Sequence, residues 1–160
     1  MKDYNRFTTA ALVIGLAVAA SGGAFAAAES GHRGHGSIVE EMTLNDGQKW
    51  QTDHALRAGM TGIREEVSVA LQRVQDGDLA AAEYAALAGN VEQHVDDIIN
   101  DCRLPPEADM QLHIALTEIL GGIDLMREGD ERHRGVAAVV RALNAYGDHF
   151  DHPGWQPLRY

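Results

Sequence analysis

The stretch that decides the fold is residues 56–78, LRAGMTGIREEVSVALQRVQDGD. Its apolar residues recur at spacings of three and four, which is the pattern of an α-helix that buries one face. These residues are Leu56, Met60, Ile63, Val67, Leu71 and Val74. The helix should end at Gln75-Asp-Gly-Asp78, because Gly and Asp favour turns and Asp78 is a good N-cap for a following helix. The stretch therefore predicts the first half of a helical hairpin.

Three more apolar stripes with helical spacing follow along the chain. They comprise Tyr84, Leu87, Val91, Val95, Ile98 and Cys102, then Leu112, Leu116, Ile119, Leu120 and Ile123, and finally Val136, Val139, Val140, Leu143, Tyr146 and Phe150. Leu104-Pro-Pro106 ends the second helix, and Pro106 is suited to the first position of the third. Glu128-Gly-Asp130 repeats the punctuation of the first turn. Two successive helical hairpins predict an all-α, up-down-up-down antiparallel four-helix bundle.

The bundle is expected to span residues 43–152, followed by a C-terminal tail at residues 153–160. Asn45 followed by Gln48 is a capping-box pattern, which predicts that the first helix begins near Asn45. We expect the tail to fold back over the open end of the bundle, where Trp155 and Trp50 would lie together.

Residues 1–26 have the pattern of an export signal. Lys2 and Arg6 form a basic start, an apolar run covers residues 10–20, and a small-x-small cleavage site ends at Ala26. The run is too short to span a membrane, and an uncleaved N-terminal anchor is the alternative. Cleavage predicts a periplasmic protein without a membrane segment. Residues 27–42 are rich in Ala, Gly and Ser and are typical of a flexible arm, which carries His32 and His35.

The composition limits the partners that the chain can bind. Its formal net charge is −11 at pH 7, and removal of the signal would make it more negative by one unit. Such a surface repels nucleic acid and anionic lipid, whereas it suits metal cations or a basic protein. Cys102 is the only cysteine, so no internal disulfide can form. The sequence leaves the oligomeric state open.

Four chemically distinctive residues lie at nearly the same count from a turn. Met60 and His94 are each 17 residues from the first Gly-Asp turn, and His113 and Tyr146 are 16 and 17 residues from the second. Equal counts place them at one level of the bundle, within about one turn or 5 Å. A thioether and two imidazoles suit copper, especially Cu(I). Asp53 extends the first stripe and would add a ligand or hydrogen-bond an imidazole.

Each of these residues also has a structural interpretation. A Met in an apolar stripe is often core filler, and a His about 60° from the centre of a stripe often hydrogen-bonds a neighbour instead of a metal. The sequence contains no Cys-x-x-Cys-His motif for covalent haem and no paired Glu-x-x-His motif of di-iron bundles. No nucleophile stands at motif spacing from a base. We therefore predict no enzymatic role.

The leading hypothesis is a periplasmic, non-enzymatic copper-binding bundle. Its ligands would be Met60, His94 and His113, with Asp53 or Tyr146 in support. One alternative is a b-type haem electron carrier. Another is a cofactor-free helical adapter that binds a basic partner through its acidic surface.

The predicted arrangement, with Met60 inward on the first helix, resembles exported four-helix bundles of the cytochrome b562 and cytochrome c-prime class. That resemblance implies a haem held between Met60 and a His of the fourth helix. This chain departs from the pattern, because its fourth helix offers Tyr146 inward and His149 off the stripe.

A second resemblance rests on five segments: Trp50-Gln-Thr-Asp53, Leu56-Arg-Ala-Gly-Met60, Cys102-Arg-Leu-Pro-Pro-Glu-Ala-Asp109, Leu112-His113 and Phe150-Asp-His-Pro-Gly-Trp155. They resemble a group of small exported proteobacterial proteins, some labelled DnrO-like. The likeness covers nearly all of the chain after the signal. It implies an exported helical bundle and little about activity.

Overall fold

The structure is a computed structural model that describes residues 37–160. The predicted export signal and residues 27–36 of the predicted arm lie outside the described residues. Within residues 37–160, no helix is long and apolar enough to cross a membrane.

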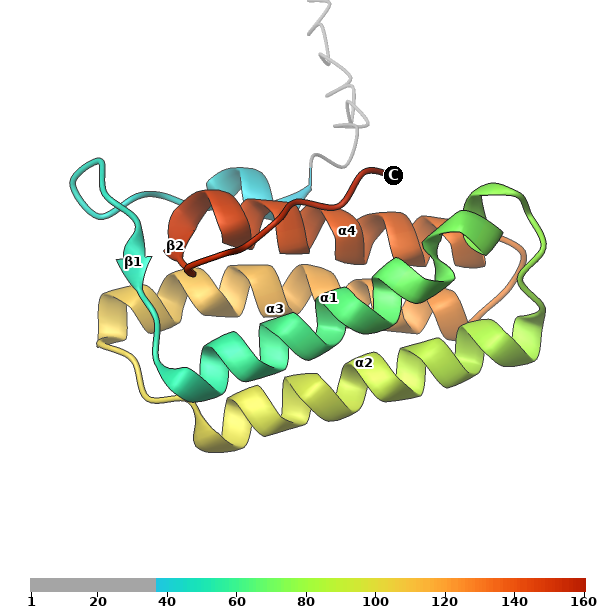
Figure 1. Ribbon diagram of the computed structural model, residues 1–160, viewed down its shortest axis with the longest axis horizontal. Helices are drawn as coiled ribbons and strands as arrows, with labels where there is room; N and C mark the ends of the chain where they lie inside the picture. The colour runs from blue at the N-terminus through green and yellow to red at the C-terminus, as the bar shows by residue number, and fades with distance from the viewer. Residues whose placement is uncertain (1–36) are drawn as a thin grey trace, which may run out of the picture. The chain divides into compact units, whose positions relative to one another are not determined.

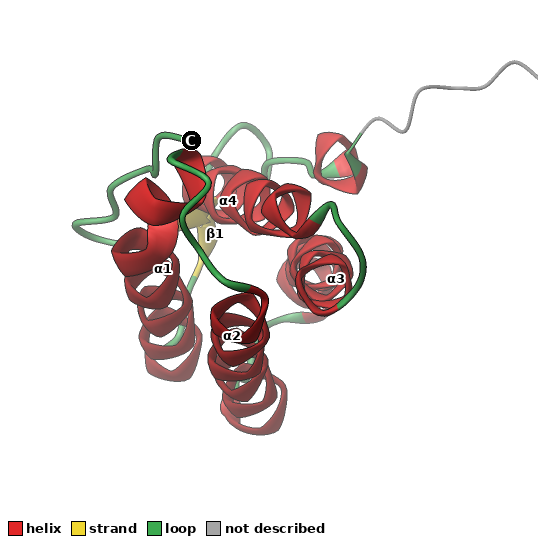
Figure 2. Cartoon of the chain, turned by 90° about the vertical axis from the view of Figure 1, so that its right-hand side faces the viewer, coloured by secondary structure: helices red, strands yellow, loops and turns green. Residues whose placement is uncertain are grey.

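Four α-helices make up most of the described chain: α1 (His54–Gln75), α2 (Ala81–Asp101), α3 (Pro106–Arg127) and α4 (Arg132–His149). Consecutive helices are joined by short connections and run antiparallel (Figure 1). Viewed along the bundle, the helices surround a shared interior, with α1 beside α2 and α3 beside α4 (Figure 2). The predicted all-α four-helix bundle is confirmed.

The apolar stripes form the core of the bundle, as their spacing predicts. Met60, Ile98 and Tyr146 are among its fully buried side chains. Leu120 is an exception and is 40% exposed. It directly follows the buried Ile119, and successive helical residues point about 100° apart. Only one of the two can therefore face the core.

Two glycines set the distance between α3 and α4. A Cβ atom on Gly122 would lie 2.7 Å from the carbonyl oxygen of Gly135, closer than real Cβ contacts allow. The absence of side chains at this crossing lets the two backbones pack directly against each other.

The predicted start of α1 near Asn45 is wrong. Asn45 and Gln48 exchange backbone hydrogen bonds across a tight turn, in which Asp46 and Gly47 have φ angles of +48° and +83°. Asp-Gly favours such a turn over helix. The chain then forms β1 (Trp50–Gln51), and α1 begins at His54 with Asp53 as its N-cap.

The bundle also extends further toward the N-terminus than residue 43. A short 3₁₀-helix, η1 (Ile38–Glu41), lies against α3 and α4. Val39 and Met42 are buried in the main core. Residues 38–42 are thus part of the packed structure, and the expectation of a flexible arm reaching residue 42 is wrong for them.

The C-terminal strap, residues 152–160, follows β2 (Phe150–Asp151), which pairs in parallel with β1. The strap does fold back, but it runs along α1 and α4 (Figure 1) and not over the open end. Arg64 donates to the carbonyl oxygen of Gln156, and Asn144 exchanges two hydrogen bonds of 2.9 Å with the backbone of Leu158. Trp155 packs against Gly147, whereas the indole N–H of Trp50 donates to the carbonyl oxygen of Thr43. The two tryptophans therefore have different partners and do not form the expected cap.

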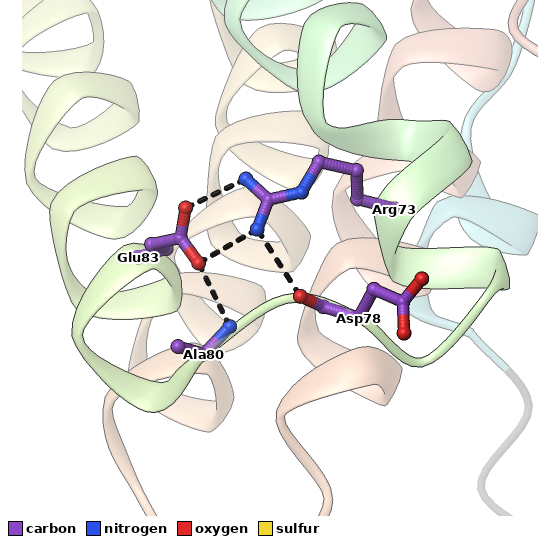
Figure 3. Close-up of polar contacts among 4 residues, drawn as sticks. All are labelled: Arg73, Asp78, Ala80 and Glu83. Carbon is purple, nitrogen blue, oxygen red and sulfur yellow. Dashed lines mark hydrogen bonds and ion pairs between the residues drawn. The ribbon is translucent and has the colours of Figure 1, made fainter.

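The connection between α1 and α2 is closed by a charged pair (Figure 3). Arg73 donates to the Glu83 carboxylate at 2.6 and 2.8 Å and to the carbonyl oxygen of Asp78 at 3.1 Å. Glu83 also accepts the backbone N–H of Ala80 at 3.0 Å. The N-cap of α2 is therefore Ala80 and not Asp78 as predicted, because the Glu83 side chain reaches back to serve the helix end.

This pair predicts a specific response to acid. The hydrogen bonds from Arg73 and Ala80 outweigh a smaller opposing effect of burial and lower the pKa of Glu83 from 4.5 to about 2. Because the pKa is lower in the folded state, the stabilisation is complete above pH 4.5 and is lost as the pH falls toward 2. We expect Glu83→Gln to flatten the fall in unfolding free energy across this range, measured by urea denaturation.

Glu128→Gln is the matched control, because Glu128 is exposed and forms no ion pair within residues 37–160. An equal effect of the two substitutions on the pH dependence would show that the Arg73–Glu83 pair adds nothing to stability.

Candidate functional site

The structure does not bring the two predicted histidine ligands together. His94 of α2 is half-buried, and its ring lies against Gly62 of α1, where an added Cβ would clash with the imidazole. The side chain of His113 on α3 is 70% exposed, and its Nδ1 hydrogen-bonds the carbonyl oxygen of Asp109 at 2.8 Å. The His94 ring packs against α1, whereas His113 lines a groove with Ile98 and Cys102 of α2.

Met60 lies fully buried in the apolar core. This position fits the interpretation of Met60 as core filler. The small residue near its level, Gly62, makes room for the His94 ring and not for a bound ion.

Asp53 is half-buried, and both of its oxygens accept hydrogen bonds from the protein backbone. Oδ1 accepts the backbone N–H of Leu56 at 2.7 Å, and Oδ2 accepts that of Arg103 at 2.6 Å. Burial opposes ionisation of this carboxyl, yet these N–H donors outweigh burial and lower its pKa. Asp53 thus caps α1 and fastens the connection between α2 and α3 to it.

Tyr146 is fully buried, as its stripe predicts, and its hydroxyl lies 2.9 Å from Nδ1 of His152. Burial raises the pKa of Tyr146 far above its ordinary value, so the phenol stays protonated. Its buried O–H needs an acceptor, and Nδ1 of His152 is its one partner within residues 37–160, so the hydroxyl donates to His152. The Tyr146 ring also contacts Phe150 and Trp155, with centroids 5.1 and 4.9 Å away. Tyr146 therefore joins the core to the strap.

The predicted metal set is not assembled in the structure. Across residues 37–160, no group of three or more His, Cys, Asp or Glu side chains is arranged to hold a metal ion. For haem, Met60 is enclosed by the core, and His149 hydrogen-bonds the carbonyl oxygen of Ala145 at 2.8 Å. Copper and haem binding stay predictions from the sequence, and the placement of these side chains gives them no support.

A groove between α2 and α3 is the most apolar of the surface cavities described. It has a volume of about 220 Å³ and is lined by Ile98, Ile99, Cys102, Asp109, Leu112, His113 and Leu116. Ile99 and the nearby α3 residue Met110 are 59% and 61% exposed. Burial and the neighbouring Asp53 raise the pKa of the Cys102 thiol to about 12, which makes this cysteine an inert part of the lining.

Exposed carboxylates also lie on the last turns of α2, outside the lining of this groove. Asp96, Asp97 and Asp101 are exposed in the last turns of α2, and no basic residue lies in its last turn. None of the three forms an ion pair within residues 37–160. The sequence did not predict this surface, because Ile99 lies off the apolar stripe of its helix. Its position beside the buried Ile98 was the available signal.

No family model, no curated protein and no solved structure matches this chain. The two resemblances noted in the sequence therefore stay predictions.

The two hydrogen bonds to Asp53 predict a structural role for this residue. We expect Asp53→Ala to lower the unfolding free energy by about 1–3 kcal/mol, because it removes an N-cap and a second anchor. Asp53→Asn should cost less, since an amide oxygen can still cap α1. Urea denaturation at neutral pH measures both.

Asp97→Ala serves as the control, because Asp97 is exposed and forms no ion pair within residues 37–160, and it should change stability by no more than about 0.5 kcal/mol. If Asp53→Ala and Asp97→Ala are equivalent, Asp53 does not fasten the fold.

Proposed function

We propose that this chain is a non-enzymatic, cofactor-free helical adapter that binds a basic amphipathic helix of a partner protein in the groove between α2 and α3. The observation that carries the proposal is the exposed Ile99 in the lining of this groove, together with carboxylates on the same last turns of α2 that form no ion pair within residues 37–160. Export to the periplasm, predicted from residues 1–26, would make the partner a periplasmic protein.

The apolar part of the surface favours a protein partner. Ile99 and Met110 each expose more than half of their surface to water. Leu112 and Leu116 also line the groove, and because they are buried they give it an apolar floor. Covering an exposed aliphatic side chain of this size stabilises a complex by about 1.5–3 kcal/mol.

A helix is the shape that fits this surface. The groove lies between two antiparallel helices, and the ridges of a third helix pack into such a groove. Helix-in-groove binding uses apolar side chains at intervals of three and four residues. Ile99 is the exposed apolar residue that provides such a contact in the groove lining.

The charged part of the surface favours a basic partner. Asp96, Asp97 and Asp101 lie at the C-terminal end of α2, where the helix dipole already presents negative charge. Lys or Arg side chains of a partner would neutralise the carboxylates and the negative end of the helix dipole. Further along the two helices, Glu92 is already paired with Arg127 of α3. Asp96, Asp97 and Asp101, by contrast, form no ion pair within residues 37–160.

Fluorescence anisotropy with a synthetic helical peptide tests the proposal. The probe carries Leu on one face and Lys on the other, and a second peptide with Glu in place of Lys should not bind. We expect Ile99→Asp to raise Kd about tenfold or more, because it places a charge on the apolar contact. The double substitution Asp96→Lys and Asp97→Lys should weaken binding and reduce its salt dependence.

Val69→Asp and Asp124→Lys are matched controls. Val69 is 83% exposed on α1, and Asp124 is an exposed acid on α3 away from the groove residues. Equal weakening by the control and groove substitutions would reduce the interaction to general charge attraction and overturn the proposal. So would the absence of peptide binding at low salt.

A further inference from the structure

A second cavity lies between α1 and the end of β2 with the start of the strap. Its volume is about 640 Å³, and its lining is mostly polar. The polar side chains that matter below are Thr52, Arg57, Thr61, Glu65, Asp151 and His152. None of them was selected from the sequence as a site residue.

Arg57 is held in a fixed orientation at this cavity. Its Nη1 donates to the carbonyl oxygen and to Oγ1 of Thr52, at 2.6 and 2.9 Å. Thr52 is itself fixed, because its hydroxyl donates to the carbonyl oxygen of Asp151 at 2.7 Å. A guanidinium anchored at one nitrogen keeps its remaining N–H groups pre-positioned for a ligand.

Those remaining donors have no acceptor in the described part of the chain. Nε and Nη2 of Arg57 form no hydrogen bond there, and Arg57 is in no ion pair, unlike Arg73, Arg127 and Arg141. Arg57 is also half-buried. The charge of Arg57 also lowers the pKa of Asp53, a residue that is not part of the cavity lining.

His152 provides a second donor. Because Tyr146 donates to its Nδ1, the proton of the neutral imidazole is on Nε2, which lies 3.5 Å from Oγ1 of Thr61 at the cavity. Burial, with a smaller effect of the Arg57 charge, lowers the pKa of His152, which favours this neutral form. The buried phenol therefore fixes which nitrogen donates.

The cavity also contains negative charge. Glu65 and Asp151 are exposed carboxylates in its lining. They repel a dianion such as phosphate, and they attract an ammonium group. Donors for one carboxylate and acceptors for one ammonium are thus present in the same cavity.

We infer that this cavity binds a small amino carboxylate, a free amino acid or a dipeptide. Its carboxylate contacts Arg57 and Nε2 of His152, and its ammonium contacts Glu65, with Asp151 adding negative charge to the cavity. The planar fork of the guanidinium matches a carboxylate better than a point charge does. This site is separate from the groove between α2 and α3, so either can exist without the other.

Thermal unfolding of residues 27–160 with individual probes tests the inference. The probes are the twenty L-amino acids and dialanine, with acetate and inorganic phosphate as comparison anions. We expect at least one amino carboxylate to raise the unfolding temperature in proportion to the logarithm of its concentration, while acetate and phosphate have smaller effects. Calorimetric titration then gives Kd for the best probe.

Substitutions locate the binding. Arg57→Lys keeps the charge but loses the fork, and should raise Kd at least tenfold. Glu65→Gln changes an exposed side chain that the fold does not need, and should weaken the amino carboxylate but not acetate. Arg141→Lys, on the face between α3 and α4, is the control and should leave Kd unchanged.

Two results would overturn the inference. One is the absence of stabilisation by every amino carboxylate at millimolar concentration. The other is binding that Arg57→Lys and Glu65→Gln leave unchanged. Because Glu65 is exposed, its variant keeps the test decisive even where substitution of Arg57 disturbs folding.

Discussion

The interaction on which the other features depend is the pair of hydrogen bonds made by Asp53. One oxygen caps α1 at Leu56, and the other holds the backbone of Arg103 in the connection between α2 and α3. The first bond fixes the start of α1 and therefore the position of Arg57 one turn later. The second fixes the end of α2, where the apolar groove lies. The Asp53 carboxylate thus helps to position both Arg57 and the end of α2 at the groove.

Tyr146 acts as a complementary tie from the core outward. Its ring fills the interior against Phe150, while its hydroxyl reaches His152 in the strap. A buried phenol needs a partner for its hydroxyl, and the strap supplies it. The hydrogen bond between Tyr146 and His152 consequently forms because the fold buries the Tyr146 hydroxyl. The same bond leaves Nε2 of His152 as a donor toward the cavity.

The helices were predictable because apolar periodicity reports burial directly, and the Met60 and Tyr146 stripes are buried as expected. The site was not predictable in the same way. Counting from a turn predicts the height of a side chain along a helix but not the direction in which it points, and His94 and His113 face different surroundings. The role of Arg57 at the cavity was not predictable, because its partners are the backbone and hydroxyl oxygens of Thr52. Such contacts produce no recognisable residue spacing in the sequence.

Electrostatics separates the two proposed binding surfaces. The net charge of −11 creates a negative field that draws a basic helix toward the groove, and salt screens that long-range attraction. The same field opposes the approach of an anion to Arg57. A ligand with no net charge escapes this penalty, because its ammonium compensates its carboxylate at long range while each end is recognised at close range. An acidic chain that keeps an unpaired guanidinium in a half-buried position is therefore better suited to a zwitterion than to a simple anion.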